Sequence, residues 1–312
     1  MIITEFGPQE TLTVRRPPAL GRVYYVSHFA PGADTNNGID PGTPFLTITY
    51  ALTQCVANRN DYIVVLDCWA EATETWPIPV SVDRVHIVGM TSPNAPYTKI
   101  KPPDATNTAV MNVTGDYVEI AGFDFGSGDD HGGVELSQGR NCWIHHCQFG
   151  SVEANKAGGL PIYGISVYAD SNTFCLVEDC HFLGQDANAG GCIGIHGITT
   201  AGAPGAVSFG WSVIRNCMFQ GIPACGIYID LTSSMVIQDN VFSVPDAVNG
   251  EAITLDLVGG VTHGNFIKGN VAGMGMLNAG YTFNPFRDLN GNTQNAWAMN
   301  YRGNQVIEPV GI

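Results

Sequence analysis

Cys142-Trp-Ile-His-His-Cys-Gln-Phe149 is a short block of sequence that returns several times along the chain. The clearest later copies are Cys175-Leu-Val-Glu-Asp-Cys-His-Phe182, Ser212-Val-Ile-Arg-Asn-Cys-Met-Phe219 and Met235-Val-Ile-Gln-Asp-Asn-Val-Phe242. Weaker copies lie at residues 85–89, 117–125 and 261–266. Hydrophobic and polar residues alternate in each copy between turn-forming residues, which is the pattern of a short β-strand. The chain is therefore built from repeats.

A second block alternates with the first and supplies another strand to each repeat. Its copies are Gly164-Ile-Ser-Val-Tyr168, Gly194-Ile-His-Gly-Ile198, Gly226-Ile-Tyr-Ile-Asp230 and Ala252-Ile-Thr-Leu-Asp256. One coil of such short strands cannot bury its hydrophobic side alone, but coils stacked about 4.8 Å apart bury a continuous core. Because the strands recur at the period of such coils, the sequence predicts an all-β solenoid.

The first block also carries a resemblance to a known fold. Its pattern of an aliphatic residue, any residue, Asn, Asp or Cys, any residue and Phe resembles the repeat of the right-handed parallel β-helix, the pectate-lyase-like fold. The resemblance covers roughly residues 80–275, and it implies a fold rather than a function, because unrelated functions share this fold.

One position of the repeat predicts a feature of the interior. In such folds the residue at the turn after the strand stacks on its own kind, and here that column would be Cys147, Cys180, Cys217, Asn240 and Asn265. Parallel Cβ vectors on neighbouring coils do not suit the torsion angle of a disulfide. We therefore predict a column of free thiols inside the solenoid.

The two ends of the chain differ from the repeats. Residues 23–27 and 61–66 are expected to be strands, and between them the hydrophobic residues of 44–56 fall at helical spacing. This order is similar to the start of many secreted and phage-borne β-helices, which implies a helix that plugs the open end of the core. We divide the chain into an extended N-terminal arm at 1–22, an N-terminal cap at 23–80, the parallel β-helix at 81–277 and a loop-rich C-terminal capping or subunit-contact tail at 278–312.

Composition narrows the possible partners. The chain has 13 Lys and Arg against 28 Asp and Glu, a net charge of −15, which argues against binding to nucleic acid or to an anionic membrane surface. Its hydrophobic runs are too short to span a bilayer, and no signal peptide is visible. We expect synthesis in a cytosol, unless a leader has been removed, and no cofactor is implied.

Strand alternation in the second block predicts the side chains that face outward. One outward column would be Ser166, His196, Tyr228 and Thr254, and the next would be Tyr168, Ile198, Asp230 and Asp256. Asp230 and Asp256 would stand on neighbouring coils, and glycosidases use such a pair of carboxylates. Both also end a strand before a turn, where aspartate commonly bonds local amides, and we favour that role. His196, Tyr228 and Tyr168 are the candidate ligand-binding residues.

Metal binding is not predicted. His145, His146, His181 and His196 show no set of converging ligands, so we expect surface or turn histidines. The acidic, glycine-rich stretch at 128–133 lacks the spacing of a calcium-binding EF-hand, and a plain loop is favoured.

Two functions remain. The first is a structural protein of a phage virion surface, such as a decoration protein or a fibre or spike component. We expect such a protein to form a homotrimer and to have other virion proteins and a polysaccharide as partners. The missing catalytic motifs and the analogy with phage β-helices favour it. The alternative is an extracellular polysaccharide-degrading glycosidase or lyase that uses Asp230 and Asp256 in a groove walled by insertions. A sugar-binding module without catalysis lies between them, and we favour a role other than that of an enzyme.

Overall fold

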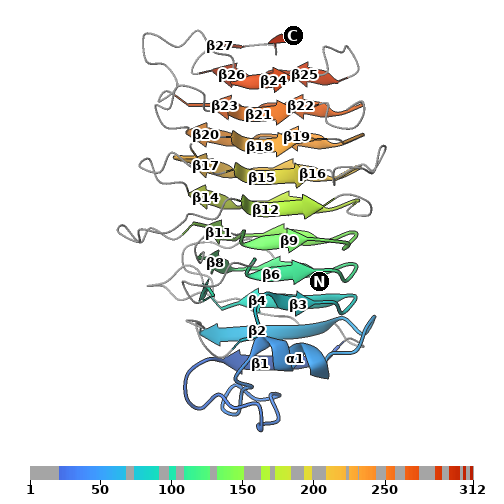
Figure 1. Cartoon of the computed structure of the whole chain (residues 1–312). Helices are drawn as coiled ribbons and strands as arrows, with labels where there is room; N and C mark the ends of the chain where they lie inside the picture. The colour runs from blue at the N-terminus through green and yellow to red at the C-terminus, as the bar shows by residue number, and fades with distance from the viewer. Residues whose placement is uncertain are drawn as a thin grey trace.

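The computed structural model describes residues 21–67, 74–90, 98–102, 109–126, 132–150, 163–168, 173–183, 193–198, 209–222, 225–230, 232–243, 251–256, 264–273, 285–289, 295–302, 305–306 and 310–311. Within these residues the chain winds as a stack of coils, drawn in Figure 1 from blue at the first coil to red at the last. Each complete coil adds one strand to each of three parallel sheets. The predicted right-handed parallel β-helix is therefore confirmed.

The three sheets run along the length of the stack. Sheet A contains β1 (Val23–Ser27), β2 (Asp61–Asp67), β4 (Val85–Gly89), β7 (Glu119–Ala121), β10 (Trp143–His145), β13 (Leu176–Glu178), β16 (Val213–Arg215), β19 (Val236–Gln238), β22 (Phe266–Lys268) and β25 (Ala296–Ala298). Sheet B contains β3 (Ile78–Val80), β6 (Met111–Val113), β9 (Val134–Leu136), β12 (Tyr163–Tyr168), β15 (Ile193–Ile198), β18 (Cys225–Ile229), β21 (Glu251–Leu255), β24 (Phe286–Asp288) and β28 (Val310–Gly311). Sheet C contains β5 (Thr98–Ile100), β8 (Phe123–Phe125), β11 (Gln148–Phe149), β14 (His181–Leu183), β17 (Met218–Gln220), β20 (Val241–Ser243), β23 (Val271–Ala272), β26 (Tyr301–Arg302) and β27 (Gln305–Val306).

The core follows from the repeat, because equivalent positions pair in register. The phenylalanine that ends the first block points inward from sheet C, and its copies stack face to face. Phe149, Phe182 and Phe219 are buried, and successive ring centroids are 4.8 and 4.6 Å apart. Gly194, the second residue of β15 in sheet B, lies directly against this stack, where an added Cβ would lie 2.6 Å from the ring of Phe219. The glycine that opens the second block is thus required by the phenylalanine that ends the first.

Two inward-facing columns flank sheet A at its turns. The first is Cys142, Cys175, Ser212, Met235, Asn265 and Asn295, and the second is Cys147, Cys180, Cys217, Asn240, Asn270 and Asn300. The expectation that Asn265 continues the column of Asn240 is wrong, because Val236 pairs with Phe266 and this register places Asn270 beside Asn240. The copy of the block in this coil begins at Asn265 and ends at Ala272. Because the other copies end in phenylalanine, this copy is hard to recognise in the sequence.

The thiol column is present as predicted. Cys147, Cys180 and Cys217 occupy consecutive coils, are buried and are free, as are the other described cysteines. Each of the three thiols lies about 3.3 Å from the carbonyl oxygen two residues before it, Cys147 bonding to His145 in this way. These local hydrogen bonds satisfy the thiols without a disulfide.

Helix α1 (Ile48–Gln54) packs against β1, β2 and β3 of the first coils (Figure 1). Ile48, Ala51 and Leu52 are buried in the same core as the strands, which agrees with their helical spacing in the sequence. The hydroxyl of Thr47 accepts a 3.0 Å hydrogen bond from the backbone N–H of Tyr50 and so caps the helix. That the helix acts as a plug against other molecules stays a prediction.

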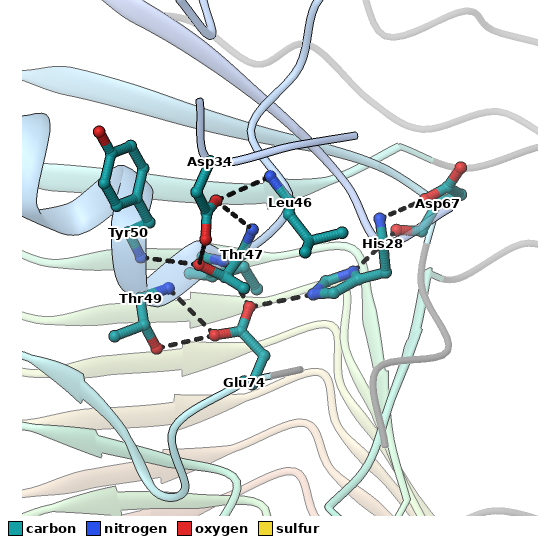
Figure 2. Close-up of polar contacts among 9 residues, drawn as sticks. His28, Asp34, Leu46, Thr47, Thr49, Tyr50, Asp67 and Glu74 are labelled. Atoms are coloured by element: carbon teal, nitrogen blue, oxygen red, sulfur yellow. Dashed lines mark hydrogen bonds and ion pairs between the residues drawn. The ribbon is translucent and has the colours of Figure 1, made fainter. Parts of the chain in front are cut away.

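A buried carboxylate from a distant segment also holds the helix start, as Figure 2 shows. Glu74 accepts hydrogen bonds from the backbone N–H groups of Ile48 and Thr49 and, at 2.7 Å, from the hydroxyl of Thr49. Its Oε1 also lies 3.0 Å from Nε2 of His28. Asp34 accepts hydrogen bonds from the backbone of the two residues that precede the helix. The segment before the helix is thus held by side chains and also by its backbone, because Phe45 forms a parallel bridge with Val26 of β1.

The C-terminal segment extends the solenoid. The segment expected as a loop-rich tail contains β24, β25 and β26, which add a strand to sheets B, A and C in turn. β27 turns back and pairs with β26 in antiparallel fashion, unlike the parallel pairs of the other coils. The predicted N-terminal arm lies outside the described residues except for its last two positions.

Candidate functional site

Sheet B presents the predicted outward column. Strand register pairs Ser166 with His196, His196 with Tyr228 and Tyr228 with Thr254. The alternate residues, such as Ile195 and Ile227, are buried in the core. Each member of the column stands one coil from the next, and we call the column the strip. His196 and Tyr228 are partly exposed, whereas Ser166 and Thr254 are buried.

His196 lies at the centre of this strip between two phenol rings. Its ring centroid is 4.7 Å from that of Tyr163 and 5.3 Å from that of Tyr228, and its Nε2 is 4.0 Å from Oδ1 of Asp230. Burial lowers the pKa of His196, although Asp230 opposes the shift. Its Nδ1 is buried and has no hydrogen-bond partner among the described residues. A neutral imidazole thus stands beside a carboxylate.

The two aspartates continue the strands of sheet B by one residue. The backbone N–H of Asp230 donates to Gly197, and that of Asp256 donates to Ile229 at 2.8 Å, so they occupy neighbouring coils as predicted. The hydroxyl of Tyr228 donates a hydrogen bond to Oδ2 of Asp256. Burial and this hydrogen bond raise the pKa of Tyr228, so its proton stays on the phenol. The side chain of Asp256 is therefore an acceptor, held in place by its neighbour.

Further charged groups border the strip. Glu251 accepts a hydrogen bond from the hydroxyl of Thr254 and pairs with Arg287 on the next coil. Toward the N-terminal end, Glu135 stands in the same outward column and accepts a 2.8 Å hydrogen bond from Ser137. The face is predominantly acidic.

The structure brings four of the five predicted site residues together. Tyr168 pairs with Ile198 at the end of its strand, but its side chain lies outside the described residues. Sequence reasoning missed Tyr163 and Glu251, which begin their strands just outside the repeated block. The available signal was their position, directly before the small residue that opens each copy.

A second polar network lies on the outer side of sheet A. Glu119 accepts from Nε2 of His145 at 3.0 Å and bonds Nδ1 of His86 through its other oxygen. The ring of Trp143 stacks on that of His145 at 3.8 Å, and His145 is fully buried. The expectation of a surface or turn histidine is therefore wrong for His145, because the indole covers it.

Among the described residues, no group of three or more His, Cys, Asp or Glu side chains is arranged to hold a metal ion. The stretch at 128–133, considered for calcium, lies almost wholly outside them. In the same part of the chain, no helix is both long and apolar enough to cross a membrane.

Comparisons with known proteins identify solved structures that have the same fold. No family model and no curated protein sequence matches the chain. A rhamnogalacturonan lyase superposes with a TM-score of 0.58 at 14% identity, over 92% of this chain and 75% of its own. Pectin methylesterase PemA from Erwinia chrysanthemi gives 0.53 at 11% identity, over 95% and 94%. An alginate lyase from Paenibacillus sp. str. FPU-7 gives 0.52 at 14% identity, over 90% and 95%.

These identities show a shared fold and no more. The solved structures with this fold include proteins named as polysaccharide lyases, yet none of their functional residues transfers to this chain at such distance. The function has to be argued from the site itself.

Proposed function

We propose that this chain is a structural protein of a virus-particle surface, such as a decoration protein or a fibre or spike component, whose sheet B contacts a glycan. The observation that carries the glycan contact is the convergence of His196, Tyr228, Asp230 and Asp256 on neighbouring coils of one rigid sheet. Sugars present hydroxyl groups that both donate and accept, and fixed carboxylates and ring nitrogens satisfy them.

The virion assignment rests on the interior of the fold and on its analogy with phage β-helices. Buried thiols on consecutive coils stay free, and this suits a protein that folds in the reducing cytosol of a host cell. A solenoid also offers long flanks along which copies can associate, and we propose a homotrimer.

The glycan contact is tested by binding and turnover on one panel of polysaccharides. We expect Tyr228→Phe and Asp230→Asn to weaken binding by about tenfold each, because each removes a charged or polar partner of the ligand. Ser243→Ala, on the exposed face of sheet C, is the matched control and should bind normally. Binding that is the same in all three variants would refute a contact at sheet B.

The particle assignment is tested separately. Antibody labelling and mass spectrometry of purified virus particles should place the chain on the particle surface, and light scattering of the isolated protein should give the mass of a trimer. A monomer that is absent from particles would contradict the proposal, whatever its affinity for glycans.

A second candidate is a polysaccharide-degrading enzyme, and the adjacency of Asp230 and Asp256 favours it. Coils about 4.8 Å apart approach the carboxylate separation of about 5 Å in retaining glycosidases. Release of reducing ends that is abolished by Asp230→Asn or Asp256→Asn, with binding retained, would establish this candidate in place of the first.

A further inference from the structure

The turn that leads into sheet A places one residue of each coil in the left-handed backbone region. Register in sheet A makes these positions equivalent, and their φ angles lie between 54° and 68°. They are Asn60, Arg84, Tyr117, Asn141, Phe174, Trp211, Ser234 and Gly264. We call this set the turn column.

Three aromatic residues of the turn column, Tyr117, Phe174 and Trp211, do not suit that backbone. Glycine and asparagine adopt the left-handed region readily, whereas a bulky aromatic residue there is a rare outlier. Asn141, Ser234 and Gly264 show that the same turn forms without a ring. Phe174 and Trp211 are therefore not explained by the needs of the turn.

Packing does not explain them either. Phe174 is 56% exposed and Trp211 is 59% exposed, so neither ring contributes a buried surface to the core. Their centroids are 6.2 Å apart and their planes differ by 22°, so the two rings stand nearly parallel on consecutive coils. Farther along the same column, Tyr117 is also exposed and carries the guanidinium of Arg84 over its ring at 4.4 Å.

We propose that Phe174 and Trp211 form a stacking platform for the sugar rings of a neutral glycan, separate from the strip on sheet B. The C–H groups on one face of a pyranose meet the negative face of an aromatic ring, and both rings of this stacked pair are more than half exposed. Asn141 and Ser234, which bracket the pair in the column, supply hydrogen-bonding side chains for the hydroxyls.

The net charge of the chain and the small area of the platform both favour a neutral glycan as the ligand. A net charge of −15 disfavours an anionic polysaccharide, so a neutral one is the better partner. Two half-exposed aromatic side chains offer far less than the roughly 800 Å² that each partner buries in a stable protein interface. A single ring-stacking ligand fits this area better than a second copy of the chain does.

The test uses residues that the turn column itself contains. Phe174→Asn and Trp211→Ser place at each position a residue found on another coil, so we expect Tm to equal or exceed that of the wild type. Titration with neutral cello-, manno- and galacto-oligosaccharides, followed by calorimetry and tryptophan fluorescence, should show affinity lower by about tenfold in either variant. Met218→Ser, on sheet C and 45% exposed, should bind as the wild type does.

The outcomes separate this inference from the proposed function, whose choice of a glycan it uses. If Trp211→Ser binds normally while Tyr228→Phe does not, the platform is refuted and the contact at sheet B stands. If none of the neutral oligosaccharides binds the wild type, the platform is refuted, and the particle-labelling experiment still decides the virion assignment. Loss of a trimer in Phe174→Asn, with glycan binding unchanged, would assign the rings to a subunit contact instead.

Discussion

The side-chain amide of Asn240 donates a 2.9 Å hydrogen bond to the side-chain oxygen of Asn270, one coil further along the solenoid. Asn270 repeats the contact with Asn300 at 3.0 Å. Each of these buried side chains also bonds a backbone group of a preceding coil, such as the carbonyl of Ile214. The asparagine column thus supplies hydrogen bonds at a turn where the parallel strands cannot.

Removing one member of this column should destabilise the solenoid. Asn240→Ala leaves the buried N–H of Cys217 without the acceptor that now lies 2.9 Å away, and it also removes the donor to Asn270. We expect a loss of about 1–3 kcal/mol in the free energy of unfolding, measured by urea denaturation. Gln238→Ala on the outer face of the same coil should change it by less than about 0.5 kcal/mol. Equal effects of the two substitutions would mean that the column is dispensable.

The thiol column should not react with alkylating reagents in the native protein. Cys180 is buried between two other cysteines, and burial raises its pKa, so no thiolate is available for reaction. We expect iodoacetamide at pH 8 to leave Cys147, Cys180 and Cys217 unmodified until urea unfolds the chain, as read by mass spectrometry of peptides. Modification in the folded protein, or a disulfide-linked peptide under non-reducing conditions, would contradict the free, buried column.

The interior of the fold was predictable because it repeats. The phenylalanine at Phe149 recurs as Phe182, Phe219 and Phe242, and the thiol at Cys147 recurs as Cys180 and Cys217, so the stacked core and the thiol column follow from the sequence. The copy that begins at Asn265 was misplaced, because Ala272 stands where the other copies have phenylalanine. Register was then assigned from the wrong asparagine.

The candidate site was predictable only in part, for a related reason. Alternation within the block correctly aligned His196 and Tyr228. The position of Tyr163, directly before the repeated block, marks it as part of the strand, but the packing of its ring against His196 is a tertiary contact that the period does not contain. The burial of His145 depends on the rotamer of Trp143, which is a tertiary feature that alternation does not contain.

Glu119 should make stability depend on acid pH. Burial opposes its ionisation, but hydrogen bonds from His145 and His86 outweigh burial and lower the pKa of Glu119 to about 2. Because the folded pKa lies below the ordinary value of 4.5, the stabilisation is complete above about pH 4.5 and is lost as pH falls toward 2.

The substitution Glu119→Gln isolates this contribution. We expect it to lower the free energy of unfolding at pH 7 by up to about 3 kcal/mol and to flatten the decline between pH 4.5 and 2. Asp179→Asn, at an exposed left-handed turn position that asparagine tolerates, serves as the control and should retain the decline. If the free energy of unfolding falls as steeply between pH 4.5 and 2 in Glu119→Gln as in the wild type, Glu119 is not the source of the decline.

Glu74 should stabilise the packing of α1 on the first coils. Its buried carboxylate bonds the start of α1 at Ile48 and Thr49 and contacts His28, so it ties the helix to two distant segments (Figure 2). Since hydrogen bonds to a charged group are among the stronger ones, Glu74→Ala should lower the free energy of unfolding by about 2–4 kcal/mol.

The loss caused by Glu74→Ala should be local before it is global. A seven-residue helix has little stability of its own, so hydrogen exchange should accelerate first in α1 and β1 and leave later coils such as β16 protected. Thr53→Ala, at the exposed end of the same helix, should leave exchange in β1 unchanged. If exchange accelerates equally along the whole solenoid, the helix is not a separable cap and the coils unfold as one unit. If only α1 and β1 respond, the carboxylate is what keeps the helix seated on the core.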